Sequence, residues 1–152
     1  MIKFISGDIL RATSQYIAAG VATGAQENLG AGLASRISSK WPDAQKHLRQ
    51  FARGNKFLGG DLFVVAPAKN RPGIIYMAIQ AETDDSTSSF LNSGLRRLER
   101  YCAKRGIESV AVNPELGSLN WEAETKPLMM KYFEYGKTIF HVYEGDPKSE
   151  TK

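Results

Sequence analysis

The sequence has little cysteine and little histidine, and both shortages exclude classes of site. Among its 152 residues there is one cysteine, Cys102, so no disulfide can form within the chain. The two histidines, His47 and His141, are far apart in sequence, and no His/Cys group has the spacing of a zinc site. We therefore expect a reducing compartment, no metal and no cofactor. We expect Cys102 to be a small buried apolar residue and the histidines to be structural or solvent-facing.

Long apolar runs are also missing. No stretch approaches the roughly 18 consecutive apolar residues that span a bilayer, and residues 1–10 lack the apolar core of a signal peptide. The net charge of +4 is a modest excess that is compatible with an anionic ligand. It would also suit weak nucleic-acid association, which no long basic run supports. We expect a cytoplasmic, monomeric protein without a membrane segment.

What is present is the pattern of an α/β domain. The chain length predicts one globular domain over residues 1–145, followed by a polar tail at 146–152. Apolar runs and alternations bounded by turn residues predict strands at 2–6, 14–21, 61–66, 73–79, 109–112 and 138–143. Helical periodicity and capping residues predict helices at 32–41, 43–53, 87–105 and 121–135. This order predicts three layers, with a central mixed sheet between helices.

Single residues mark the predicted helix ends. Pro42 should stop the first helix, because a proline disfavours helical backbone at the residue before it. Asp43 could cap the second helix. Gly106 and Gly136 should end the third and fourth helices.

A glycine-rich loop at 23–33 joins the second predicted strand to the first predicted helix. Glycines allow the backbone to approach a ligand closely. The first N–H groups of a helix lack partners within the helix and can bind an anion. The loop has neither the G-x-G-x-x-G spacing nor the lysine of a P-loop. It predicts a phosphate cradle, with a tight strand-to-helix connection as the alternative.

Three loops compete for the site, because ligands of open α/β sheets bind beyond the carboxyl ends of the strands. They are 7–9, the glycine loop, and 114–120. Two of them are glycine-containing strand-to-helix loops, and two such cradles side by side suit a diphosphate. Asp8 would then accept hydrogen bonds from an amino group such as that of adenine. The alternative for Asp8 is a carboxylate that stabilises its own turn.

Three motifs together resemble a known family. IKFISGDIL (2–10) is similar to the opening strand and turn of macro domains, ENLGAGLASRISSKWP (27–42) to their glycine loop and first helix, and VAVNPELGSLNWE (110–122) to their second phosphate loop. The resemblance runs in order over nearly the whole chain. It is nearest to the terminal ADP-ribose glutamate-hydrolase branch and the related ADP-ribose-1″-phosphate phosphatase branch.

The resemblance implies a macro-domain fold that binds ADP-ribose or an ADP-ribosylated substrate. Asp8 would contact the adenine amino group, Ile9 would lie against adenine, and Tyr143 would stack beside it or serve as a core aromatic. Asn28 could reach the distal ribose, and the two loops would enclose the diphosphate. The full set of implied ligand-binding residues is Gly7, Asp8, Ile9, Asn28, Leu29, Gly30, Ala31, Gly32, Leu33, Glu115, Leu116, Gly117, Ser118, Leu119, Asn120 and Tyr143.

The chain departs from the catalytic signatures of that family. The glutamate-hydrolase branch has a lysine where this chain reads Gln80-Ala81-Glu82, and an aspartate in the second loop that is missing from 115–120. The N-A-A-N signature of the mono-ADP-ribosyl hydrolases is replaced by Val21-Ala22-Thr23-Gly24. A covalent lysine mechanism is therefore not expected, and the catalytic residues are unknown.

Two readings of the activity stay open beside simple binding. Glu27, Glu82 and Glu115 are the loop carboxylates that could act as a general base for an ADP-ribosyl hydrolase or an ADP-ribose-1″-phosphate phosphatase, and each is otherwise a solvated charge. The other reading is a non-catalytic nucleic-acid or protein interaction module that keeps the fold. It depends on the basic side chains of the third predicted helix, namely Arg96, Arg97, Arg100, Lys104 and Arg105.

Overall fold

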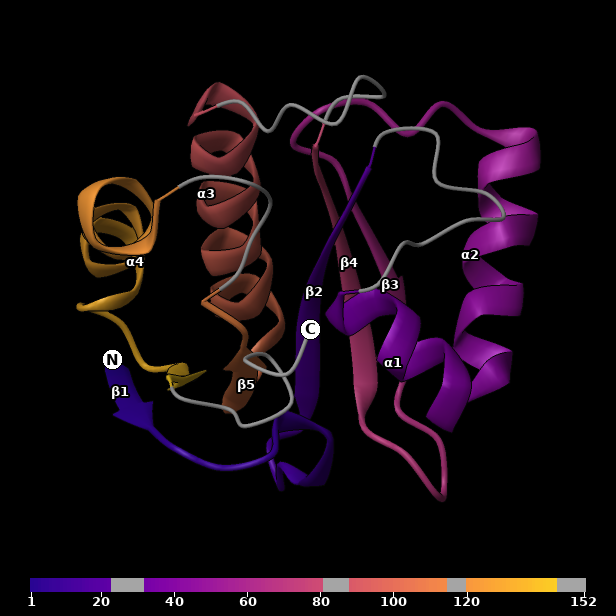
Figure 1. Cartoon of the computed structure of the whole chain (residues 1–152), viewed down its shortest axis with the longest axis horizontal. Helices are drawn as coiled ribbons and strands as arrows, with labels where there is room; N and C mark the ends of the chain where they lie inside the picture. Colours follow the sequence, from indigo (N-terminus) through magenta and orange to yellow (C-terminus); the bar gives the residue numbers. More distant parts are fainter. Residues whose placement is uncertain (23–31, 81–87, 115–119, 145–152) are drawn as a thin grey trace.

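The computed structural model describes residues 1–22, 32–80, 88–114 and 120–144. Its centre is a six-stranded sheet of order β1-β6-β5-β2-β4-β3. Every neighbouring pair is parallel except β3 with β4, which is antiparallel. The sheet is therefore mixed, and five of its strands run in one direction (Figure 1).

The elements follow the order that the sequence predicts. The strands are β1 (Ile2–Ile5), β2 (Tyr16–Ala22), β3 (Leu62–Val65), β4 (Gly73–Gln80), β5 (Ser109–Val112) and β6 (Ile139–Tyr143). The helices are the 3-10 turn η1 (Ile9–Arg11), α1 (Leu33–Lys40), α2 (Pro42–Gly54), α3 (Ser88–Arg105), the π-helical turn η2 (Trp121–Thr125) and α4 (Lys126–Phe133).

Two apolar cores bind the helices to the two faces of the sheet. On one face, α1 and α2 bury Ile37 and Leu48 against β2 and β4. On the other face, α3 and α4 bury Leu95 and Phe133, and the Phe133 ring stacks on Phe140 of β6 at 3.8 Å between ring centroids. The short, continuous apolar runs of the central strands arise because both of their faces are covered. The predicted α/β fold with three layers is confirmed (Figure 1).

The predicted helix ends are correct in part. α1 ends at Lys40, but Pro42 also begins α2, where its fixed φ suits the first helical position. Asp43 as a cap is wrong, because no side chain caps α2 and the Asp43 carboxylate pairs with Arg71 at 2.9 Å. The fourth predicted helix is a π turn followed by α4, with Pro127 in the first turn of α4.

Gly106 and Gly136 have φ of 66° and 140°, which side-chain-bearing residues rarely adopt, and they follow α3 and α4 as predicted. Over the described ranges, no helix combines the length and apolar character that a bilayer crossing requires.

Candidate ligand-binding site

The parallel strands bring the points from which the predicted site loops start to one edge of the sheet. β1, β2, β4, β5 and β6 all run in the same direction, so their carboxyl ends meet there. The segments 23–31, 81–87 and 115–119 follow β2, β4 and β5 and lie outside the described residues. Nine predicted ligand residues fall in these segments: Asn28, Leu29, Gly30, Ala31, Glu115, Leu116, Gly117, Ser118 and Leu119. The other seven are described below.

Asp8 stands directly after β1 and caps a short turn. Gly7 before it has φ of 132°, which requires glycine. The Asp8 side chain then accepts a hydrogen bond from the Leu10 N–H at 3.0 Å, and its carbonyl accepts from the Arg11 N–H at 2.9 Å. The turn-stabilising role weighed from sequence is therefore present. The Asp8 side chain is still 20% exposed at the carboxyl edge of the sheet.

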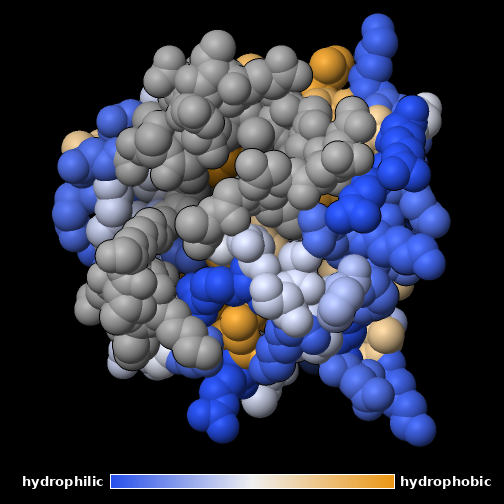
Figure 2. Space-filling view, turned by 45° about the vertical axis from the view of Figure 1, so that its right-hand side comes forward, coloured by the Kyte–Doolittle hydropathy of each residue, from blue (hydrophilic) through white to orange (hydrophobic). Residues whose placement is uncertain are grey.

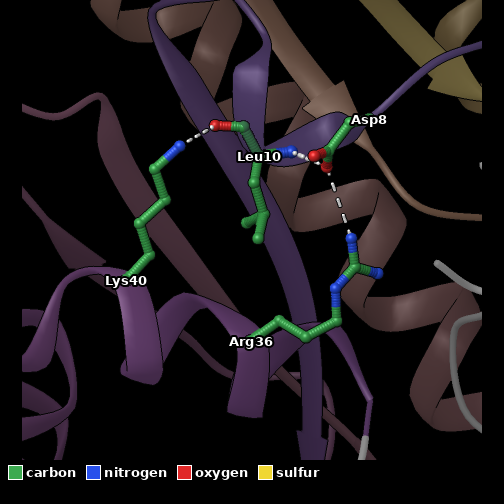
Figure 3. Close-up of polar contacts among 4 residues, drawn as sticks. All are labelled: Asp8, Leu10, Arg36 and Lys40. Carbon is green, nitrogen blue, oxygen red and sulfur yellow. Dashed lines mark hydrogen bonds and ion pairs between the residues drawn. The ribbon is translucent and has the colours of Figure 1, made fainter.

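Two cations of α1 fasten this turn to the helix that follows the glycine loop. The Arg36 guanidinium lies 3.4 Å from the Asp8 carboxylate, and the Lys40 ammonium donates to the Leu10 carbonyl at 2.9 Å (Figure 3). Because Arg36 and Lys40 are four residues apart, both project from the same face of α1. Sequence reasoning missed both residues, although this spacing directly after a predicted ligand loop was a usable signal.

Ile9 and Tyr143 form the apolar wall beside Asp8. Tyr143 ends β6, pairs with Ile5 of β1, and is 9% exposed, while Ile9 is fully buried in the same core. Burial raises the pKa of the Tyr143 hydroxyl, and the negative charge of nearby Asp8 raises it further. The side chain of Tyr143 is thus a core aromatic at the strand end, adjacent to the predicted adenine position.

Gly32 and Leu33 begin α1. Gly32 is the N-cap without any side-chain cap, and its carbonyl accepts from the Arg36 N–H at 3.2 Å. A Cβ added to Gly32 would meet no described atom within 4 Å. Leu33 is 6% exposed and anchors the start of the helix in the core. The first N–H groups of α1 have no acceptor within the helix and are suited to an anion.

Asn120 is already engaged by its own helix. Its side-chain oxygen accepts from the Ala123 N–H at 2.8 Å and so caps η2. The next residue, Trp121, donates from its indole nitrogen to the Glu144 carboxylate at 3.0 Å. This bond joins the start of η2 to the end of β6 beside Tyr143, and sequence reasoning did not identify it.

The proposed general bases Glu27, Glu82 and Glu115 all lie outside the described residues. In the ranges that are described, no group of three or more His, Cys, Asp or Glu side chains is arranged to hold a metal ion. His141 lies 3.2 Å from the Ser14 hydroxyl, and burial and the nearby charge of Lys3 lower its pKa.

Comparison with known proteins shows which solved structures share this fold. No protein-family model and no curated protein matches the chain. Among solved structures, the macrodomain of Thermus aquaticus DarG is 22% identical with a TM-score of 0.82 and covers 95% of this chain and 98% of its own. The macrodomain of Mycobacterium tuberculosis DarG is 24% identical with a TM-score of 0.82, covering 94% and 97%. Thermosipho africanus DarTG in complex with ADP-ribose is 22% identical with a TM-score of 0.81, covering 93% of this chain and 41% of its own. At these identities the likeness establishes the fold.

Proposed function

We propose that this chain, which has the macrodomain fold, binds ADP-ribose at the carboxyl edge of its parallel strands. The observation that carries the proposal is the position of Asp8. Its partly exposed carboxylate stands at this edge, tied through Arg36 to α1, whose free N-terminal N–H groups begin at the glycine loop. The ion pair between Asp8 and Arg36 thus connects a hydrogen-bond acceptor for an amino group, the Asp8 carboxylate, to donors for a phosphate, the first N–H groups of α1. The solved complex of Thermosipho africanus DarTG with ADP-ribose supports this ligand.

In this proposal the turn after β1 takes the adenosine end. Asp8 accepts from the adenine amino group, and the wall formed by Ile9 and Tyr143 limits the space behind the base. The glycine loop and the first N–H groups of α1 take the diphosphate, because a helix N-terminus favours negative charge. Residues 116–119 form the opposing loop.

Calorimetric titration with ADP-ribose tests the proposal. Asp8→Asn is the sharpest variant, because asparagine also caps well and so preserves the turn while removing the charge. We expect Asp8→Asn to weaken binding by about 10- to 100-fold, the usual effect of losing a hydrogen bond to a charged group. Glu108→Gln, which removes a carboxylate at the opposite, amino end of β5, should leave affinity within about twofold. Absence of binding heat with the intact chain at millimolar ADP-ribose would refute the proposal.

Hydrolysis of an ADP-ribosyl derivative is the finer form of the same proposal. The activities in question are an ADP-ribosyl hydrolase and an ADP-ribose-1″-phosphate phosphatase, with Glu27, Glu82 or Glu115 as base. Turnover of ADP-ribose-1″-phosphate that is abolished by one of the three Glu→Gln substitutions supports catalysis. Saturable binding without turnover of either substrate class supports a pure binder.

Nucleic-acid binding is the second candidate, and the distribution of charge favours it. Residues 32–60 contain six lysines and arginines and one aspartate, a net charge of +5 in a chain whose total is +4. Figure 2, with the α2 side turned forward, shows mainly hydrophilic residues over its right-hand part. The candidate basic face is on α2, because Arg36 and Lys40 of α1 are engaged at the Asp8 turn. On α3, where the sequence suggested it, Arg97 pairs with Asp61 and Arg105 lies over the Tyr101 ring.

A salt series separates this candidate from ADP-ribose binding. Fluorescence anisotropy with a labelled single-stranded oligonucleotide should give an affinity that falls steeply as salt rises, because each neutralised phosphate releases counterions. Lys46→Gln with Arg53→Gln should reduce the slope of log affinity against log salt by about 1 to 2, whereas Arg96→Gln with Arg100→Gln on α3 should not. An affinity that is independent of salt contradicts this candidate.

A further inference from the structure

A cavity lies at the opposite end of the parallel strands from the proposed ADP-ribose site. Its volume is about 440 Å³, within the range of small-molecule sites. It opens between the end of α3, the turn after α4, and the residues that lead into β5 and β6. Those strands are parallel, so the cavity is at their amino ends, whereas Tyr143 and the rest of the candidate site are at the carboxyl edge.

The inner wall of this cavity is mostly apolar, and the hydroxyl group in it already has a hydrogen-bond partner. Cys102, Ile107 and Phe140 line it, and all three are buried in the core below α3 and α4. Thr138 also lines it, but its hydroxyl already donates to the Ile107 carbonyl at 2.7 Å. An apolar body can therefore enter without leaving a buried hydrogen-bonding group unpaired.

An exposed aromatic ring stands at the mouth. Tyr135 lines the cavity, yet its side chain is 80% exposed, the most exposed large apolar residue of the described chain. Gly136 follows it with φ of 140°, a conformation that turns the chain sharply after α4. A ligand in the cavity would cover ring surface that water now contacts.

Glu99 supplies the charge. It lines the cavity from α3, is partly buried, and makes no hydrogen bond or ion pair with the residues that the structure describes. A Cβ placed on Gly136 would lie 3.7 Å from Glu99 Oε1, so the carboxylate reaches over this turn. Its negative charge also adds to burial in raising the pKa of the Cys102 thiol to about 12.

The other charges around the cavity are of both signs. Glu108 adds a second carboxylate, and Lys137 is the one basic side chain of the lining. The Met1 ammonium donates to the carbonyls of Gly136 at 3.1 Å and Thr138 at 2.8 Å, and burial lowers the pKa of this ammonium while the Glu99 charge acts to raise it. Among the described residues, neither cation forms an ion pair with Glu99, so its carboxylate can pair with a cationic ligand.

We propose that this cavity is a second ligand site, which takes a small organic cation with an apolar body. The apolar part would lie against Ile107 and Phe140, the cationic group would pair with Glu99, and the Tyr135 ring would cover it through a cation–π contact. This site is separate from the ADP-ribose proposal and does not depend on it.

Three probes with one common body test the charge requirement. Phenethylamine is a cation at neutral pH, phenethyl alcohol is its neutral analogue, and phenylacetate is its anionic analogue. In an amide NMR titration of the full chain, phenethylamine should shift signals of residues 102–108 and 135–138 with millimolar affinity, as expected for so small a ligand. The alcohol should bind at least about threefold more weakly, and phenylacetate should not saturate.

Two variants assign the cation to Glu99. Glu99→Gln breaks no described hydrogen bond or ion pair, so the variant should keep the NMR spectrum of a folded protein. It should weaken the binding of phenethylamine by about 3- to 10-fold, so that phenethylamine no longer binds more tightly than the alcohol. Glu122→Gln is the control, because it removes an exposed carboxylate of η2 that does not line the cavity, and it should change affinity by less than about twofold. Absence of shifts at these residues, equal binding of the three probes, or unchanged binding to Glu99→Gln would each overturn the proposal.

Discussion

The bond between Asp8 and Arg36 gives the sharpest test of how the candidate site is held. The two side chains are 3.4 Å apart and 20% and 19% exposed, so the pair lies between a surface ion pair and a buried one. Surface pairs contribute at most about 1 kcal/mol, and removing one partner of a buried pair costs about 3 to 5 kcal/mol. We expect Arg36→Met to lower the free energy of unfolding by about 1 kcal/mol, a fall in Tm of roughly 2 to 4 °C.

A double-mutant cycle isolates the interaction from other effects of the substitutions. Asp8→Asn keeps a capping side chain on Leu10, so combining it with Arg36→Met should give a coupling energy of about 0.5 to 1 kcal/mol in urea unfolding. Lys40→Met is the control, since Lys40 bonds the Leu10 carbonyl instead of the carboxylate, and its effect should add to that of Asp8→Asn. Additive effects of Asp8→Asn and Arg36→Met would refute the conclusion that α1 positions the Asp8 carboxylate.

Three further outcomes follow from the core. Phe133→Ala should cost about 3 to 5 kcal/mol in urea unfolding, because Phe133 is fully buried and stacked on Phe140; a loss below 1 kcal/mol contradicts that packing. Gly73→Ala should lower the free energy of unfolding by more than about 1 kcal/mol, since the new Cβ would clash with the Tyr16 ring; a chain as stable as the original contradicts that contact. Burial raises the pKa of the Cys102 thiol from 9.0 to about 12, so the unfolded chain loses this proton first and stability should fall between those pH values. The free energy of unfolding of Cys102→Ala should fall less over the same pH range. Equal pH profiles for the variant and the original chain would exclude the thiol as a cause.

The order of elements and the class of fold could be predicted from the sequence because both depend on local pattern. Apolar runs bounded by turn residues marked the strands, and Gly7, Gly106 and Gly136 marked backbone turns that only glycine readily makes. The edge that carries the candidate site also followed, since parallel strands joined by helices must end together. Asp8 was found in this way, as was its alternative role in the turn.

The partners of those residues could not be predicted, because they are contacts between segments that are distant in the chain. Arg36 is 28 residues from Asp8, and Trp121 is 23 residues from Glu144. The pairing of Arg97 with Asp61 has the same origin, since whether a charge is paired depends on the tertiary structure. Sequence alone determined which chemical groups stand at the carboxyl edge of the sheet. Only packing decided that α1 holds the Asp8 turn in place and that a cavity lined by Glu99 forms at the other end.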